Sequence, residues 1–365
     1  MRRRLLLAAL ATQASFAACG ARSDLSAGDE LSAASTVDAA SAARTDGGAD
    51  ARRDATPDGP VRDAGPLPGP CRVGEAPVVL AAGQDFPENV VADATHVFWA
   101  NSRGGEVSRV PKTGGAVQII ATQQARPRGI AVDDAFVYWT NVIGGEVLRA
   151  PKLSAGRAPT VLASRERFPE GIAVTSDALY WTGGGVGNGR VMRLDTGAAA
   201  PDLIARGADP YGIATDGTSV YWVVQSGDPT TSPSGTISRV SVTGGAVTLL
   251  ATRVATPYHV ALDDDSVYFT SNDGVYSVAK AGGPVATLAA KQFFARGVAV
   301  FEDDVYWAEN GRGNIFRAPK RGGAATLIGT GSAPHGVFVD ASCVYWANTG
   351  VSNTRGGSIM RAPRR

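Results

Sequence analysis

Eight residues that could bind a ligand or move a proton recur at nearly regular intervals in this 365-residue chain. Two are carboxylates, two are cations, two are phenols and two are imidazoles. A carboxylate beside a cation can hold a polar ligand, and an imidazole can act as a general base. The eight candidate ligand-binding residues are Glu88, Arg128, Glu170, Tyr211, Tyr258, His259, Arg296 and His335.

An aromatic pair recurs with the same spacing, 38 to 47 residues from one copy to the next. All six tryptophans of the chain occupy the second position of this pair. Such internal self-similarity indicates seven copies of one structural unit. The seven pairs are Phe98-Trp99, Tyr138-Trp139, Tyr180-Trp181, Tyr221-Trp222, Tyr268-Phe269, Tyr306-Trp307 and Tyr345-Trp346.

Each unit contains four short apolar runs separated by Gly, Pro and Asp turns, as in residues 129–133, 137–141, 145–152 and 160–163. The runs are rich in β-branched and aromatic residues, which is typical of strands, and no long stretch has a helical period. Four strands in about 40 residues form the blade of a propeller. We therefore predict an all-β fold, a seven-bladed β-propeller of four-stranded antiparallel blades.

The sequence Tyr138-Trp139-Thr140-Asn141 resembles the repeat of YWTD propellers, in which the fourth residue is Asp. Asn101 and Asn348 take the same place in two other repeats. Over about residues 76–363 the chain resembles the YWTD and NHL-like (TolB-like) repeat propellers. This resemblance implies the propeller fold and leaves the ligand open.

The last repeat ends after its third strand, so its fourth strand must come from elsewhere. Residues 77–81 match a fourth strand and have no first three before them. We expect this N-terminal strand to complete the last blade and close the ring. Cys71 precedes this closing strand and Cys343 opens the second strand of the last blade; the two strands run the same way and begin on the same face, so a disulfide is expected there. The alternative is two unpaired thiols.

The first 19 residues resemble the export signal of a bacterial lipoprotein, with three arginines, an apolar run and Cys19. Cys19 is the expected lipidation site, and Gly20 after it favours the outer membrane. The alternative is an ordinary secretory signal and a periplasmic or extracellular protein. Residues 20–70 lack large apolar side chains and are expected to be a disordered tether. The propeller should occupy residues 71–365.

Strands that alternate in direction place the links of a blade on two faces. The turns from strand one to two and from three to four are short, and we call their side the short-turn face. The opposite side, the irregular-loop face, carries longer loops, including 225–235 and 349–357. The eight candidate residues fall at or next to the start of strand one, where the irregular-loop face meets the central channel. They predict either a ligand pocket at this mouth or a ring of structural pairs between blades, such as Glu88 with Arg128.

Two further repeated features are expected to be structural. Asp residues occur in the short turns, where their side chains cap the backbone. Arginines recur at one position of strand three: Arg109, Arg149, Arg193, Arg239, Arg317 and Arg361.

The formal net charge of +1 and the absence of phosphate-binding, hydrolase or metal-site motifs restrict the function. We expect no nucleic-acid partner, no cofactor and no metal, and a monomer whose only membrane contact is the lipid anchor. The favoured hypothesis is a non-catalytic module that binds a protein, peptide or glycan. The alternative is a lyase- or hydrolase-type enzyme, because such enzymes occur among propellers related to NHL rings. His335 or His259 would then be the base, and Arg296 or Arg128 would hold an anionic substrate.

Overall fold

The computed structural model describes residues 71–153, 156–185, 187–225, 227–228, 232–350 and 355–365. The chain divides into two units, residues 1–63 and 64–365, and the described residues all belong to the second. The predicted export signal, Cys19 and the 20–70 tether lie outside the described residues. Within those residues, no helix could cross a membrane.

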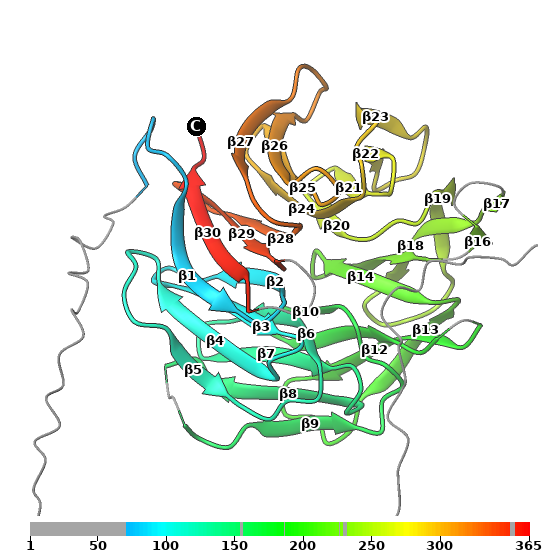
Figure 1. The fold of residues 1–365 in the computed structure, drawn as a ribbon. Helices are drawn as coiled ribbons and strands as arrows, with labels where there is room; N and C mark the ends of the chain where they lie inside the picture. The colour runs from blue at the N-terminus through cyan, green and yellow to red at the C-terminus, as the bar shows by residue number, and fades with distance from the viewer. Residues whose placement is uncertain (1–70, 154–155, 186, 226, 229–231, 351–354) are drawn as a thin grey trace, which may run out of the picture. The chain divides into compact units, whose positions relative to one another are not determined.

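The described residues form seven four-stranded antiparallel sheets and contain no helix (Figure 1). Blades 1 to 3 consist of β2 (Pro87–Ala92), β3 (His96–Asn101), β4 (Glu106–Pro111), β5 (Gln118–Ala121), β6 (Pro127–Val132), β7 (Phe136–Asn141), β8 (Glu146–Pro151), β9 (Thr160–Ser164), β10 (Ile172–Val174), β11 (Ala178–Gly183), β12 (Gly189–Asp195) and β13 (Asp202–Gly207).

Blades 4 to 6 follow the same order, and blade 7 combines the C-terminal strands with the first strand of the chain. Their strands are β14 (Pro210–Thr215), β15 (Ser219–Val224), β18 (Gly235–Ser241), β19 (Thr248–Val254), β20 (Val260–Leu262), β21 (Ser266–Thr270), β22 (Gly274–Ala279), β23 (Ala286–Ala290), β24 (Ala295–Phe301), β25 (Asp304–Glu309), β26 (Asn314–Pro319), β27 (Thr326–Thr330), β28 (Pro334–Val339), β29 (Cys343–Asn348), β30 (Gly357–Pro363) and β1 (Val78–Gln84).

The first strands of the blades contact one another in a closed cycle, from β2 through β6, β10, β14, β20, β24 and β28 back to β2. This cycle surrounds a central channel, and the other strands of each blade extend outward from it. The predicted seven-bladed β-propeller is confirmed. The loop between β15 and β18 differs from the expected irregular segment, because β16 (Gly227–Asp228) and β17 (Ser232–Pro233) pair within it.

The aromatic pair packs each blade against both of its neighbours. Successive side chains of a strand point to opposite faces of the sheet. In blade 2, Trp139 therefore clusters with Phe98 of blade 1, while Tyr138 clusters with Trp181 of blade 3. Seven such clusters occupy the seven interfaces between blades, and all six tryptophans are at most 1% exposed.

Most of the buried indole N–H groups find a partner at the end of the preceding blade's outer strand. Trp139 Nε1 donates to Gln124 Oε1 at 2.9 Å, and the acceptor stands 15 residues before the tryptophan. The same side-chain acceptor occurs in three other blades, where Gln84, Glu166 and Gln292 accept the indole N–H of Trp99, Trp181 and Trp307. Gly207 and Gly331 take this position before Trp222 and Trp346, whose Nε1 atoms have no partner among the described residues.

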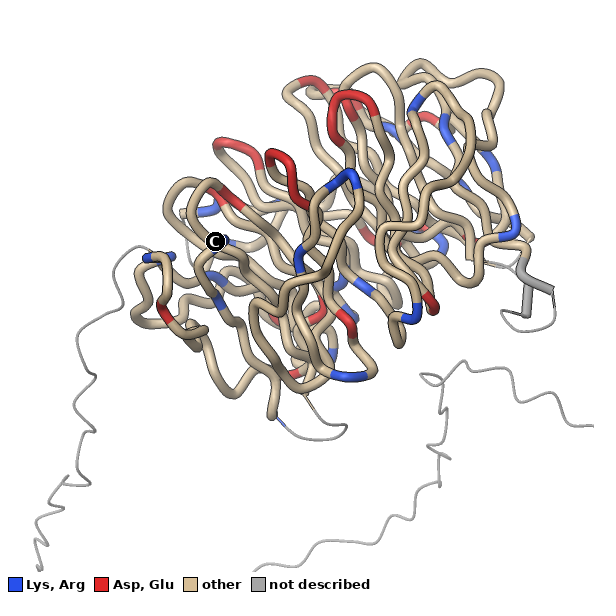
Figure 2. The backbone as a smooth tube through the Cα atoms, turned by 90° about the horizontal axis from the view of Figure 1, so that it is seen from above, with Lys and Arg blue, Asp and Glu red and all other residues tan. Residues whose placement is uncertain are grey.

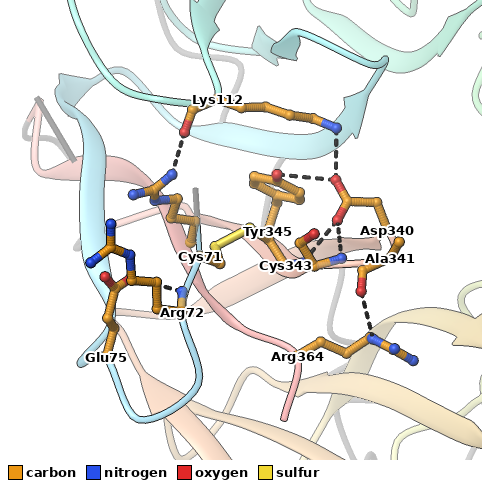
Figure 3. The surroundings of a disulfide bond; sticks show 11 residues. Cys71, Arg72, Glu75, Lys112, Asp340, Ala341, Cys343, Tyr345 and Arg364 are labelled. Atoms are coloured by element: carbon orange, nitrogen blue, oxygen red, sulfur yellow. Dashed lines mark hydrogen bonds and ion pairs between the residues drawn. A yellow bond between two sulfur atoms is a disulfide. The ribbon is translucent and has the colours of Figure 1, made fainter. Parts of the chain in front are cut away.

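The ring closes as predicted. β1 pairs with β30, with Val79 opposite Met360, and thereby supplies the fourth strand of blade 7. A disulfide joins Cys71 to Cys343 across a Cα–Cα distance of 5.8 Å (Figure 3). The disulfide is typical of an exported protein.

A repeated ion pair joins neighbouring blades on the short-turn face. Asp340 of blade 7 accepts hydrogen bonds from the backbone N–H of Cys343 and from the Tyr345 hydroxyl, and Lys112 of blade 1 reaches it at 2.7 Å (Figure 3). The Asp side chains therefore cap the turns, as expected. The same Lys–Asp contact recurs in Lys152–Asp93 (2.9 Å), Lys280–Asp216 (2.8 Å) and Lys320–Asp263 (2.8 Å).

The strand-three arginines also join blades. Arg193 donates to the Val242 carbonyl at 2.8 Å, and Arg239 donates to the Lys280 carbonyl at 2.8 Å, each in the next blade. Arg109, Arg317 and Arg361 make the equivalent contact. The predicted structural role is confirmed for these five, whereas Arg149 lies over the Phe136 ring of its own blade at 4.3 Å.

Candidate functional site

The inner strands approach one another so closely at the mouth that most blades carry glycine there. A Cβ at Gly129 would lie 2.3 Å from the Glu170 carbonyl oxygen of the next blade. The same crowding applies to Gly171, Gly212, Gly297 and Gly336. Blades 1 and 5 instead carry Asn89 and His259 at this position, so only these two side chains project from it.

Threonines following the aromatic pair hold three of the mouth residues in place. The Thr140 hydroxyl accepts the Gly129 N–H at 2.9 Å and donates to the Glu170 carbonyl at 2.8 Å. Thr182 and Thr270 make the same bridge to the carbonyls of Tyr211 and Arg296. These bridges connect the first strand of one blade to the start of the next.

Two of the mouth residues lie slightly outside their strands. β10 begins at Ile172 and β20 at Val260, so Glu170 and Tyr258 precede them by two residues. The backbone N–H of Glu170 donates to the Thr182 carbonyl, and the N–H of Tyr258 donates to the Thr270 carbonyl. These bonds keep both residues at the mouth.

Arg128 stands between two carboxylates from its neighbouring blades. Its Nε atom lies 2.6 Å from Glu88 Oε2, and its Nη1 atom lies 3.0 Å from Glu170 Oε2. Since Glu88 is only 1% exposed, the cation offsets a charge that burial would otherwise disfavour.

Two tyrosine rings connect Arg128 to Arg296 along the mouth. The Arg128 guanidinium carbon lies 4.8 Å from the Tyr211 ring centre, and the two tyrosine rings, Tyr211 and Tyr258, meet edge to face at 6.0 Å. Arg296 stacks on Tyr258 at 3.4 Å. Both guanidinium groups therefore lie against aromatic faces, which favours a cation.

The two imidazoles lie beside each other. The ring centres of His259 and His335 are 5.9 Å apart and nearly perpendicular, and Tyr211 lies 6.3 Å from His259. His335 is 8% exposed, and its Nδ1 atom has no hydrogen-bond partner among the described residues. This atom is a buried polar position that a ligand or water molecule would satisfy.

Burial and neighbouring charges shift the protonation of the mouth. Burial, opposed by Arg128 and reinforced by Glu88, raises the pKa of Glu170. Burial and Arg128 lower the pKa of His259 to about 4. Burial and Arg296 lower the pKa of His335 well below its usual value. Both imidazoles are therefore neutral at pH 7.

A cavity of about 160 Å³ lies in the channel between these side chains. Its polar lining comes from Asn89, Arg128, Glu170, Tyr211 and His259, and the inner strands supply an apolar wall. No group of three or more metal-ligating side chains occurs in the described part of the chain.

The structure brings all eight predicted residues together at one end of the channel. It contains the predicted Glu88–Arg128 pair between blades and a cavity lined by Arg128, Glu170, Tyr211 and His259, but not by the other four candidates. Ligand binding at this mouth stays a prediction. Sequence reasoning missed Asn89 and the threonine bridges. Asn89 replaces a repeated glycine, as His259 does, and that substitution was the available signal.

The fold and the mouth define a seven-bladed β-propeller with a non-repeating polar ring. No protein-family model and no curated protein matches the sequence. Among solved structures, a streptogramin B lyase is 14% identical, with a TM-score of 0.62 over 78% of this chain and 95% of that chain. Virginiamycin B lyase from Staphylococcus aureus is 14% identical, with a TM-score of 0.63 over 78% of this chain and 97% of the lyase. A chain of Kuenenia stuttgartiensis hydrazine synthase is 16% identical, with a TM-score of 0.63 over 76% and 96%. At these identities the similarity shows the propeller fold alone.

Proposed function

We propose that this chain is a cell-envelope lipoprotein, anchored through Cys19, whose propeller binds a protein, peptide or glycan on the irregular-loop face. The main support is the contrast within the repeat at the mouth. Its backbone is nearly the same in every blade, while its side chains differ from one blade to the next. A rigid scaffold that presents non-repeating polar groups around a cavity is typical of recognition sites.

The protonation of the mouth favours binding over acid–base catalysis. A general base works best when its pKa lies near the working pH. The pKa of His259 is about 4, and that of His335 is also well below neutral. Arg128 is engaged by two carboxylates. Neutral imidazoles and paired charges can still donate and accept hydrogen bonds, which is what binding requires.

Affinity capture from envelope extract tests the proposal. The baits are the full chain and a variant carrying Arg296→Ala and His335→Ala, after circular dichroism shows that both fold. A matched control carries Arg157→Ala and Arg321→Ala on the short-turn face. A partner retained by the control and lost from the mouth variant supports the proposal. An enzymatic activity that disappears in His335→Ala, with the fold intact, would contradict it.

Anchoring is tested separately. Metabolic labelling with a radioactive fatty acid should mark the full chain and should not mark Cys19→Ser. An unlabelled wild-type chain recovered in the soluble fraction would contradict the lipid anchor without affecting the proposal for the propeller.

A further inference from the structure

The two faces of the propeller carry opposite exposed charges. On the irregular-loop face, eight of the nine exposed charged residues in the described part of the chain are basic, and Asp273 is the exception. This excess is hidden in the formal net charge of +1 for the whole chain. The eight are Arg103, Arg165, Arg167, Arg206, Arg253, Lys291, Arg312 and Arg355.

The short-turn face has the opposite balance, with ten acidic and four basic exposed residues among those described. Figure 2 shows acidic turns gathered along one side of the ring. The acidic residues are Glu75, Asp134, Asp177, Asp195, Asp202, Asp216, Asp264, Asp265, Glu302 and Asp303, and the basic ones are Arg72, Arg157, Arg321 and Arg365. The exposed charges therefore favour an anionic partner on the irregular-loop face over the short-turn face.

Four of the basic residues form an arc along the rim of the irregular-loop face. Arg165, Arg206, Arg253 and Lys291 occupy one repeat position, at the end of the outer strand, in blades 2 to 5 in succession. All four are exposed, and none forms an ion pair with a described residue. The remaining blades have uncharged residues at this position.

Stability does not explain the arc. Arg206 lies directly opposite Arg190 in the β12–β13 ladder, and like charges in that arrangement are destabilising. Arg190 Nε is buried without a hydrogen-bond partner among the described residues. Unneutralised like charges at neighbouring positions indicate a surface that a negatively charged partner covers.

Exposed aromatic and aliphatic side chains lie on the same face. Ile143 is 68% exposed, Phe168 is 52% and Phe293 is 50% exposed. Phe294 lies beside Phe293, with ring centres 4.6 Å apart. Phe168 and Phe294 have positive φ angles of 44° and 57°, which bulky residues rarely adopt. The fold therefore holds large apolar groups in water beside the basic arc.

From these observations we infer that the irregular-loop face docks an acidic segment of a partner protein. The choice of a protein rests on the exposed phenylalanines that lie beside the basic arc, because phenylalanine and arginine are both enriched in protein interfaces. The inference rests on the proposed function and selects the protein among its possible partners.

Binding of defined polyanions to the full chain tests this inference. The probes are fluorescent poly-L-glutamate, a random copolymer of glutamate and tyrosine, alginate and phosphatidylglycerol vesicles. We expect the copolymer to bind most tightly, because its tyrosines contact the exposed phenylalanines, and salt to weaken this binding. The variant Arg165→Glu, Arg206→Glu, Arg253→Glu and Lys291→Glu should bind the copolymer at least about tenfold more weakly.

Matched variants separate a specific surface from general charge. The control Arg157→Glu and Arg321→Glu changes exposed arginines on the short-turn face and should leave binding unchanged. Phe168→Ser and Phe293→Ser should abolish the preference for the copolymer over poly-L-glutamate.

Three outcomes would overturn the inference. These are equal loss of binding in the control, binding of alginate or vesicles as tight as that of the copolymer, and no binding of either polypeptide. Capture of a partner that depends on the mouth, together with any of these, would show that the proposed function holds and that the acidic-protein inference alone is wrong.

Discussion

The two faces of this propeller differ in what the repeat holds constant. On the short-turn face, an aspartate, a lysine from the next blade and a tyrosine recur with nearly the same distances, as in Lys112–Asp340 and Lys280–Asp216. On the irregular-loop face, the mouth positions at the start of each blade's first strand carry acids, bases, phenols and imidazoles that differ from blade to blade. The same contact recurs between most neighbouring blades on the short-turn face, whereas at the mouth the residues that contact the next blade, such as Arg128, differ from blade to blade.

The largest expected effect comes from the closure on the short-turn face. Replacing Cys71 and Cys343 by serine should lower the free energy of unfolding by about 2–5 kcal/mol. Without the disulfide, the unfolded chain gains conformational freedom that favours unfolding. Chemical denaturation monitored by tryptophan fluorescence measures this change. A reducing agent should destabilise the wild type and leave the double variant unaffected. A wild type insensitive to the reductant would contradict the role of this bond.

Close packing at the mouth gives the next effect. Gly129→Ala should destabilise the protein by about 1–3 kcal/mol, because its Cβ would lie 2.3 Å from the Glu170 carbonyl oxygen. Gly185→Ala is the matched control in a loop of the same face, where nothing lies within 4 Å of the added Cβ. Thermal unfolding of the two variants makes the comparison. Equal stability would show that the inner strands separate without cost.

The buried tryptophans allow a smaller test within one repeat position. Trp139→Phe and Trp222→Phe remove the same ring volume, but only Trp139 loses a hydrogen bond, the one to Gln124. The first substitution should therefore cost about 1 kcal/mol more than the second in equilibrium unfolding. The chain already tolerates phenylalanine at Phe269, where the residue 15 positions earlier is Val254. Equal costs would mean that the amide–indole bonds contribute nothing to stability.

Much of the fold could be predicted from the sequence because the aromatic pair marks every interface between blades. The isolated strand 77–81 and the position of Cys71 were sufficient to predict the closure. The position of the mouth followed from the repeat as well, since residues at one repeat position must meet around the channel. Its pairing followed only in part, because the sequence indicated the Glu88–Arg128 pair but not that Arg128 would also face Glu170.

The charge difference between the faces was also beyond the sequence. It depends on which charged side chains are exposed and on which form ion pairs, such as Lys152–Asp93. The sequence indicated where turns occur but not these pairings. For part of the loops 225–235 and 349–357, the predicted role stays a prediction, because several of their residues lie outside the described structure.

The two faces should also lose stability in different ranges of pH. Although burial opposes ionisation of Asp93, hydrogen bonds from Lys152 and from backbone N–H groups lower its pKa from 3.8 to about 2. The unfolded chain therefore takes up a proton between about pH 4 and 2 that the folded chain does not, so stability falls as the pH falls through this range. Lys152→Met should reduce this loss.

The mouth should respond at higher pH. The pKa of His259 falls from 6.5 to about 4 on folding, and that of His335 is also lowered, so the unfolded chain binds protons between pH 6.5 and 4 that the folded chain excludes. Stability should therefore decline as the pH falls through this range, opposed in part by Glu170, whose pKa is raised. Replacing both histidines by glutamine should flatten the decline in urea unfolding measured from pH 7 to 4.

His96 provides the control, because it is the third histidine of the chain and lies on the short-turn face. Its pKa is lowered by burial and by Arg109, but it is less buried than the mouth pair. His96→Gln should therefore leave most of the decline in place. If His96→Gln flattened the decline and the mouth variant did not, the imidazoles at the mouth would have to be accessible to protons. Acid–base catalysis by these imidazoles would then no longer be disfavoured.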